Sequence, residues 1–345
     1  MKSTNLNLMI LLTFLVCCTW AYAAPYTTAM RFSHENNDDG EVRGPGVDEW
    51  PVYNQDQHQI DLNHDERLEG DFFYAMELSG NSNFSFINEE VPGDEPQNCR
   101  VKNTTYVDCT AGNLKKVPST SFPSNILVFI LNRNEINKLP EYAFFKYKLL
   151  QILEIQYNQI AQIDPLAFSG LSNLERLDLY GNKLVMDSAT RRNAFSDNVF
   201  APLKNLKWLR LNRNNPQPNN KAFRYPDKAL AQLSSLETLF LDGFPEPVFE
   251  SGFANLTLLR YLSLNGYKDG YCQLNGLKNE TFRHMTSLQN LLIRDCKLQG
   301  HKIEAGTFLP LKKLYSLDVS HNQDINVQFF DRLFYVNAAY HAHYK

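Results

Sequence analysis

Apolar residues recur through most of the chain in one repeating pattern. Eight windows between residues 126 and 324 fit L-x-x-L-x-L-x-x-N-x-L, in which the leucine positions hold mostly Leu or Ile. Because alternate side chains of a strand point to opposite faces, each L-x-L segment predicts a short strand with its leucines directed inward. The asparagine position is filled in turn by Asn134, Asn158, Asn182, Asn214, Phe244, Tyr267, Cys296 and Asn322, with gaps averaging about 27 residues.

A second pattern has the same period. Six residues before the first leucine of the second to eighth windows stand Phe144, Phe168, Phe200, Leu230, Phe253, Phe282 and Phe308. Repeats of this length predict an α/β leucine-rich repeat solenoid, with a curved, parallel concave sheet and an irregular convex side. Each coil then buries its apolar face only against its neighbours. The asparagine should tie backbone groups of the turn that follows, and we expect irregular turns at Phe244 and Tyr267.

The chain divides into five parts. Lys2, the apolar stretch Leu6–Trp20 and the small residues Ala21–Ala23 predict a secretory signal peptide over 1–23. A membrane anchor is the alternative, but the stretch is short for a bilayer, and no later apolar run predicts a span. We then expect an acidic disordered segment over 24–98, a cap over 99–125, about eight repeats over 126–335 and an irregular tail over 336–345.

The near-neutral total charge hides a strong asymmetry. Residues 24–98 hold 17 acidic residues against three Arg and no Lys, whereas the whole chain has a net charge of −4. The acidic segment is too polar to repay its ordering entropy, which predicts disorder. Its apolar islands, such as Phe72–Tyr74, could dock on the folded part or remain exposed. The balanced composition gives no reason to expect nucleic acid as a partner.

Secretion determines how the cysteines are interpreted. Four remain after the signal peptide, and an even number in an oxidising compartment favours disulfides. Cys99 and Cys109 can tie a small hairpin that extends the sheet and caps the first coil. Cys272 and Cys296 lie 24 residues apart and could bridge two coils, or Cys296 could simply replace the repeat's asparagine. The same setting makes credible glycan acceptors of four Asn-x-Ser/Thr sites: Asn83, Asn103, Asn255 and Asn279.

The concave face of the predicted sheet carries aromatic and Arg residues at outward positions. Such residues are enriched at binding hot spots, although they could also be an ordinary sheet face with cross-strand pairs. Two long polar insertions, 186–198 and 216–227, flank the fourth window and should loop out. This surface suits an anionic or partly lipidic ligand, or the acidic segment folding back. The predicted ligand-binding residues are Arg176, Tyr180, Trp208, Arg210, Arg213, Phe240 and Tyr261.

Three motifs resemble the ectodomain of Toll-like receptors. They are the cap 99–109, the segment 163–184, and the pair Cys272 and Cys296 with the sequence between them. The resemblance covers about residues 99–335 and implies a secreted or cell-surface protein of innate immunity that binds protein or microbial ligands and forms homo- or heterodimers. The chain departs from the family in having only about eight repeats, with no cysteine-rich C-terminal cap, membrane span or TIR domain. Truncation of a longer receptor is one interpretation, and a tail that covers the last coil is the other.

Enzyme chemistry is not predicted. Nucleophile elbows, phosphate-binding loops and metal-binding helix motifs are absent from the sequence, so we expect no catalytic residues, metal or cofactor. The alternative function is a secreted matrix or adhesion protein similar to small leucine-rich proteoglycans, whose N-terminal tails are acidic and contain tyrosine. Those proteins usually carry four cysteines in the cap, whereas this chain has two, and this difference favours the receptor.

Overall fold

The repeat windows form a ladder of parallel strands. In this computed structural model the described residues are 29–31 (backbone only), 99–186, 194–214, 224–266, 270–323 and 325. All of them belong to one compact unit, formed by Met1–His34 and Val91–Lys345. The eight windows give the strands β4 (Val128–Ile130), β6 (Ile152–Glu154), β8 (Arg176–Asp178), β9 (Trp208–Arg210), β10 (Thr238–Phe240), β11 (Tyr261–Ser263), β12 (Asn290–Leu292) and β13 (Ser316–Asp318).

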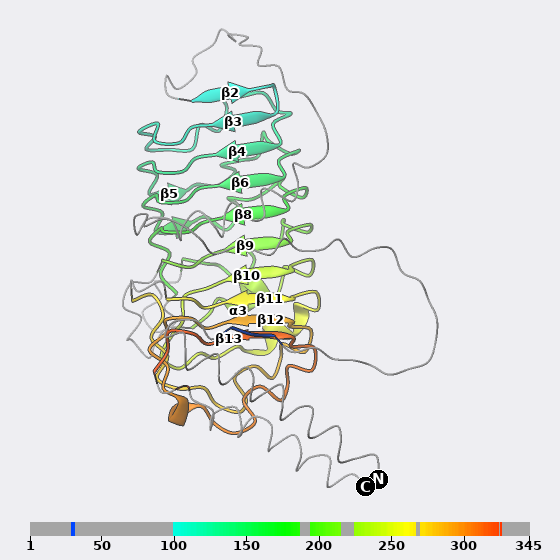
Figure 1. The fold of residues 1–345 in the computed structure, drawn as a ribbon. Coiled ribbons are helices and arrows are strands. Elements are labelled where there is room, and N and C mark those ends of the chain that lie inside the picture. Colours follow the sequence, from blue (N-terminus) through cyan, green and yellow to red (C-terminus); the bar gives the residue numbers. More distant parts are fainter. Residues whose placement is uncertain are drawn as a thin grey trace, which may run out of the picture. The chain divides into compact units, whose positions relative to one another are not determined.

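These strands pair in chain order, each parallel to the next (Figure 1). The register aligns the central leucine-type residues, so that Leu177 lies opposite Leu209 and Leu209 opposite Leu239. All three are fully buried. The second pattern is also confirmed, since Phe144 stacks on Phe168, with ring centroids 6.3 Å apart, and Phe282 stacks on Phe308 at 5.7 Å. The leucine-rich repeat solenoid predicted from the sequence is therefore the fold of the described chain.

The predicted cap is a disulfide-bonded hairpin. Strands β2 (Arg100–Lys102) and β3 (Tyr106–Asp108) pair antiparallel, and β3 pairs parallel with β4. A disulfide joins Cys99 and Cys109, with 4.1 Å between their Cα atoms. The hairpin thus covers the open edge of the first coil, as the sequence predicted.

The opposite edge of the sheet is paired by a strand from the N-terminal part of the chain. Strand β1 (Ala29–Arg31) runs antiparallel to β13, with Met30 opposite Leu317. It lies within residues 24–98, where composition predicts disorder. The rest of that segment lies outside the described residues, as do the signal peptide, Asn83 and the tail 336–345, and the predictions for them stay predictions.

The ladder asparagines connect each coil to the one before it. Asn182 is an example: its Nδ2 donates to the carbonyls of Ile155 and Leu179 at 2.8 and 3.0 Å, and its Oδ1 accepts the N–H of Ile160 at 3.1 Å. We expected bonds to the following turn, but the asparagine also reaches back to the preceding coil. Each side chain therefore satisfies buried backbone groups of two coils at once.

The predicted insertions do not simply loop out. Met186, Ala194 and Phe195 are buried, and so is Tyr225, at the end of the second insertion. Tyr225 stacks on Phe244, with ring centroids 4.7 Å apart. The apolar residues within each insertion therefore return to the core because burial removes their surface from water. The polar parts, 187–193 and 215–223, lie outside the described residues.

The remaining elements are short. A two-stranded parallel sheet joins β5 (Lys138–Leu139) to β7 (Gln162–Ile163). The helices are α3 (Asp227–Leu230) and the 3-10 turns η1 (Ser251–Asn255) and η2 (Gly300–Lys302). None of the helices in the described ranges combines the length and hydropathy that crossing a membrane requires.

Candidate binding surface on the sheet

The side chains between the inward leucines form the outer sheet face. On β8 to β11 they stand in two rows, because strand residues alternate between the two faces of a sheet. The register aligns the members of each row across neighbouring strands. The first row is Arg176, Trp208, Thr238 and Tyr261, and the second is Asp178, Arg210, Phe240 and Ser263.

An aromatic series crosses three strands of this face. The ring centroids of Trp208 and Phe240 lie 5.3 Å apart, and those of Phe240 and Tyr261 lie 5.4 Å apart. Both pairs are tilted, at separations typical of favourable aromatic contacts. Trp208 and Phe240 are 7% and 3% exposed. The series is therefore a packed apolar strip rather than a set of freely projecting rings.

Each arginine of the face lies against an aromatic ring. The Arg176 guanidinium carbon is 3.6 Å from the ring centroid of Trp208, and that of Arg210 is 3.9 Å from Tyr180. Such cation–π contacts stabilise by about 0.5–2 kcal/mol each, more when they are desolvated. Burial raises the pKa of the Tyr180 phenol. The two arginines are thereby held flat against the sheet.

Arg213 extends the surface at the turn after β9. Its Nη1 donates to the hydroxyls of Tyr180 and Tyr157 at 3.0 and 3.2 Å. Its backbone has φ of 61°, a left-handed conformation that is uncommon for a residue other than glycine. The buried carboxylate of Asp242 holds this backbone by accepting the N–H groups of Arg213 and Asn214. Asp242 thus fixes the turn that positions the Arg213 side chain.

The structure brings all seven predicted binding residues into one contiguous cluster. Arg176, Trp208, Phe240 and Tyr261 are linked through rings, and Arg210, Tyr180 and Arg213 through ring and hydroxyl contacts. They are more buried than the sequence suggested, because they pack on one another. Whether they bind a ligand stays a prediction.

Sequence reasoning missed two acidic residues at the centre of this face. Glu154 and Asp178 occupy the same row on neighbouring strands, and Arg176 lies 3.5 and 3.8 Å from their carboxylates. Burial raises the pKa of both carboxyl groups, and the neighbouring charge of Asp178 raises that of Glu154 further. Each stands between two inward apolar residues, the signal that could have identified them. Their charges offset those of Arg176 and Arg210, so the centre of the face is not cationic.

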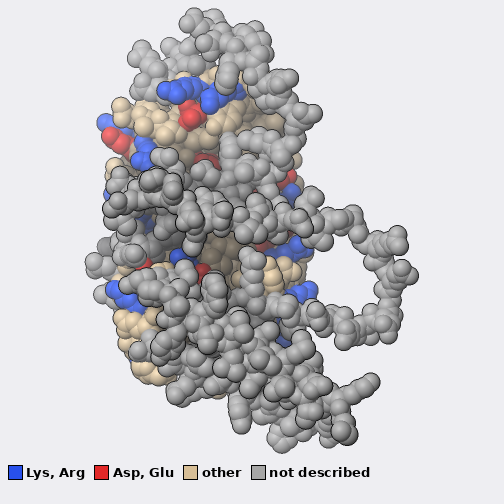
Figure 2. All heavy atoms as spheres, in the orientation of Figure 1, with Lys and Arg blue, Asp and Glu red and all other residues tan. Residues whose placement is uncertain are grey.

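Basic side chains gather instead at the β2 end of the sheet (Figure 2), where Arg100 and Lys102 are exposed. Towards the other end, Arg294 is exposed and lies 3.6 Å from the Asp318 carboxylate. In the described ranges no group of three or more His, Cys, Asp or Glu side chains is arranged to hold a metal ion.

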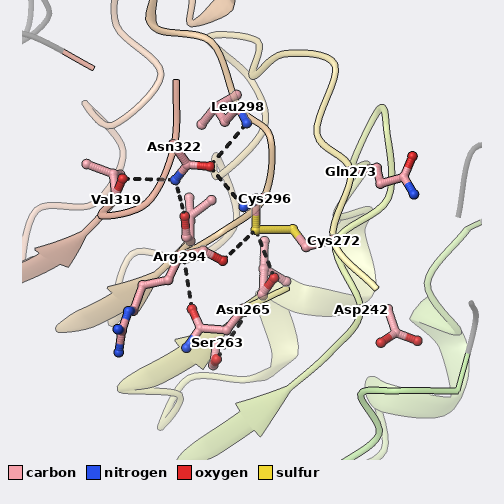
Figure 3. The surroundings of a disulfide bond; sticks show 12 residues. Asp242, Ser263, Asn265, Cys272, Gln273, Arg294, Cys296, Leu298, Val319 and Asn322 are labelled. Atoms are coloured by element: carbon pink, nitrogen blue, oxygen red, sulfur yellow. Dashed lines mark hydrogen bonds between the residues drawn. A yellow bond between two sulfur atoms is a disulfide. The ribbon is translucent and has the colours of Figure 1, made fainter. Parts of the chain in front are cut away.

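A second disulfide joins the turns beside the sheet. Cys272 and Cys296 are bonded, with 4.5 Å between their Cα atoms (Figure 3). Cys296 also fills the asparagine position, so both sequence alternatives hold. Its Sγ lies 3.1 Å from the carbonyl of Leu264, but a disulfide sulfur carries no hydrogen and cannot replace the amide donor. A Cβ on Gly243 would lie 1.9 Å from the Cys272 Sγ, which requires glycine there.

Three of the four predicted glycan acceptors lie in the described ranges. Asn103 is exposed in the turn between β2 and β3. Asn255 ends η1, and Asn279 lies in the segment that returns to β12; both are exposed and away from the outer sheet face. Their positions leave room for glycans, although glycosylation itself stays a prediction.

Comparisons with known proteins agree with the repeat pattern. The leucine-rich repeat family model matches residues 124–184. Toll-like receptor 3 of Bos taurus is 27% identical over 219 residues, which cover 62% of this chain and 21% of the receptor. Lumican of Mus musculus is 26% identical over 239 residues, which cover 66% of each chain. This chain thus matches about a fifth of the receptor's length.

A solved structure resembles the fold. Human 5T4 (Wnt-activated inhibitory factor 1, trophoblast glycoprotein) superposes with a TM-score of 0.50 at 24% identity, covering 67% of this chain and 83% of that one. This likeness shows the fold alone. With the two disulfides, the relatives support an extracellular leucine-rich repeat protein; they include both receptors and proteoglycans, neither of which are enzymes.

Proposed function

We propose that this extracellular leucine-rich repeat protein is a recognition protein that binds its ligand on the outer sheet face. Within that class we favour a protein of innate immunity that resembles the ectodomain of a Toll-like receptor, secreted or held at the cell surface. The observation that carries the proposal is the contiguous cluster of Trp, Tyr, Phe and Arg on β8 to β11.

The composition of the cluster supports binding. Trp, Tyr and Arg are the residues that most often dominate the energy of interfaces, especially where they lie in packed, desolvated surroundings. Here Trp208 and Arg210 are both 7% exposed and held by neighbouring rings. Because their side chains are already ordered, a ligand would pay little additional conformational entropy to bind them.

A matrix or adhesion protein is the second candidate. It is favoured by the match to mouse lumican, which covers 66% of both chains, whereas the match to the bovine receptor covers only 21% of that protein. Retention of the purified chain on decellularised extracellular matrix, lost when the outer sheet face is altered, would favour this candidate over the receptor.

The test compares two double variants. Trp208→Ala with Arg210→Ala removes the centre of the cluster, whereas Phe145→Ala with Leu149→Ala removes two exposed apolar residues outside the sheet. Both are measured against displayed peptide libraries and anionic phospholipid vesicles. We expect the first variant to lose binding by at least tenfold, at about 1.4 kcal/mol per factor of ten, and the second to retain it. Equal binding by both variants would contradict the proposal.

A further inference from the structure

Two hydrogen-bond donors on the outer sheet face lack acceptors. Among the described residues, neither Nε1 of Trp208 nor Nε of Arg176 has a hydrogen-bond partner, although both atoms are buried. The nearest carboxylate oxygen to Arg176 Nε, on Glu154, is 3.5 Å away. That distance allows attraction between charges but exceeds the 2.7–3.2 Å range of good N–H···O bonds.

The two donors belong to one small site. Arg176 and Trp208 are register partners on β8 and β9, and the guanidinium stacks on the indole ring at 3.6 Å. Trp208 is 7% exposed, and the Arg176 side chain, at 17%, is reached from the solvent side of the sheet. A buried donor without an acceptor costs about 1–3 kcal/mol. Such a cost in a folded protein calls for an explanation, and a bound ligand acceptor supplies one.

The charges around the donors determine which acceptor fits. Arg176 lies between two carboxylates, those of Glu154 and Asp178, within 3.8 Å. Arg210 provides the only other charge in contact with this group among the described side chains of β6, β8 and β9. An anion placed against Trp208 would therefore meet two carboxylates against two guanidiniums and gain little. A neutral oxygen avoids that repulsion and still satisfies the donors.

We infer that Trp208 and Arg176 form a subsite for the neutral backbone carbonyl of a polypeptide partner. The inference rests on the proposed function and names its ligand class. A peptide amide offers both an acceptor and a donor, and the partly exposed Glu154 carboxylate beside Arg176 can accept the amide N–H. Phe240 and Tyr261 continue the apolar strip from Trp208, where large apolar side chains of the partner can pack. This differs from the anionic or lipidic ligand expected from the sequence.

The key variant is Trp208→Phe, which keeps an aromatic ring but removes the N–H. Two displayed libraries of 12-residue peptides serve as probes, one without charged residues and one rich in Asp and Glu. An N-acetylated chito-oligosaccharide tests the other common source of amide carbonyls. Tyr315→Phe is the matched control, because it removes a polar atom from a residue that is 48% exposed beside β13.

We expect the uncharged library to supply binders whose affinity falls about tenfold in Trp208→Phe and is unchanged in Tyr315→Phe. The melting temperature of unliganded Trp208→Phe should be unchanged or higher, because the variant removes an unsatisfied donor. Loss of binding without loss of stability is the signature that a purely structural tryptophan would not give.

Several outcomes would overturn the inference. They are enrichment of the acidic library alone, no binders from either library, full affinity in Trp208→Phe, or binding of the oligosaccharide in place of peptides. The proposed function fails separately. If Trp208→Phe retains affinity but Trp208→Ala with Arg210→Ala abolishes it, the outer sheet face binds ligand and only the carbonyl subsite is wrong.

Discussion

The guanidinium of Arg176 lies 3.6 Å from the centre of the Trp208 ring, and the two residues are register partners on neighbouring strands. This contact joins the charged centre of the outer sheet face to its aromatic strip. On one side of it stand the carboxylates of Glu154 and Asp178, and on the other the rings of Phe240 and Tyr261. The surface therefore combines a neutralised polar group with apolar area, as a polypeptide ligand requires.

The carboxylates should make stability depend on pH. Burial raises the pKa of Glu154 above its usual 4.5 and that of Asp178 above 3.8. The folded state therefore binds more protons than the unfolded state over this range, and the stabilisation is complete below those usual values and lost as pH rises through the folded pKa values. We expect Glu154→Gln to become more stable relative to the wild type as pH rises from about 4. Urea unfolding at a series of pH values measures this difference, and a difference independent of pH would contradict it.

The asparagine ladder should be a major source of stability. Asn182→Ala removes three hydrogen bonds to backbone groups of two coils and leaves those groups buried. We expect a loss of about 3 kcal/mol in the free energy of unfolding. The control is Asn205→Ala, whose exposed amide donates only to the carbonyl of Ser172 and should cost about 0.5 kcal/mol. Comparable losses in the two variants would show that the ladder has no special role.

The bridge between Cys272 and Cys296 should stabilise the later coils. It closes a loop with a sequence separation of 24, and replacing both residues by Ala should cost about 2–4 kcal/mol. Unfolding in urea measures the cost, and peptide mapping without reduction checks the pairing in the wild type. Recovery of either cysteine as a free thiol in the secreted protein would rule out this bridge.

Glycans should leave the binding surface open. Asn255 and Asn279 are exposed on returning segments, away from β8 to β11. Enzymatic removal of N-linked sugars should therefore leave the affinity for a selected peptide within twofold of the untreated protein, a difference of about 0.4 kcal/mol. A rise in affinity well beyond that, in wild type but not in Asn255→Gln, would show that the Asn255 glycan covers the site.

Much of the fold followed from spacing alone. The period of about 27 residues and the phenylalanine series located each strand and the core, because a solenoid repeats one local solution in every coil. Tyr225 could not be predicted in the same way. It belongs to an insertion without a counterpart in other coils, and its burial against Phe244 depends on a contact that no period encodes.

The candidate site was predicted in its membership but not in its electrostatics. Outward aromatic and Arg residues identified the face because strand alternation determines which side chains share it. Counting only those residue types made the surface look cationic. The neutralising effect of Glu154 and Asp178 depends on register across β6 and β8, and the unpartnered N–H of Trp208 depends on three-dimensional packing.

The most direct test of the outer sheet face as the binding surface is photo-crosslinking from defined positions. The photoreactive residue p-benzoylphenylalanine replaces Tyr261, at the end of the aromatic strip, or Tyr142, which is 48% exposed outside the sheet. Each protein is irradiated with a bound peptide from the uncharged library, and the adducts are mapped by mass spectrometry. We predict crosslinks from position 261 and none from position 142. Efficient crosslinking from position 142 with none from position 261 would contradict the assignment of the outer sheet face as the binding surface.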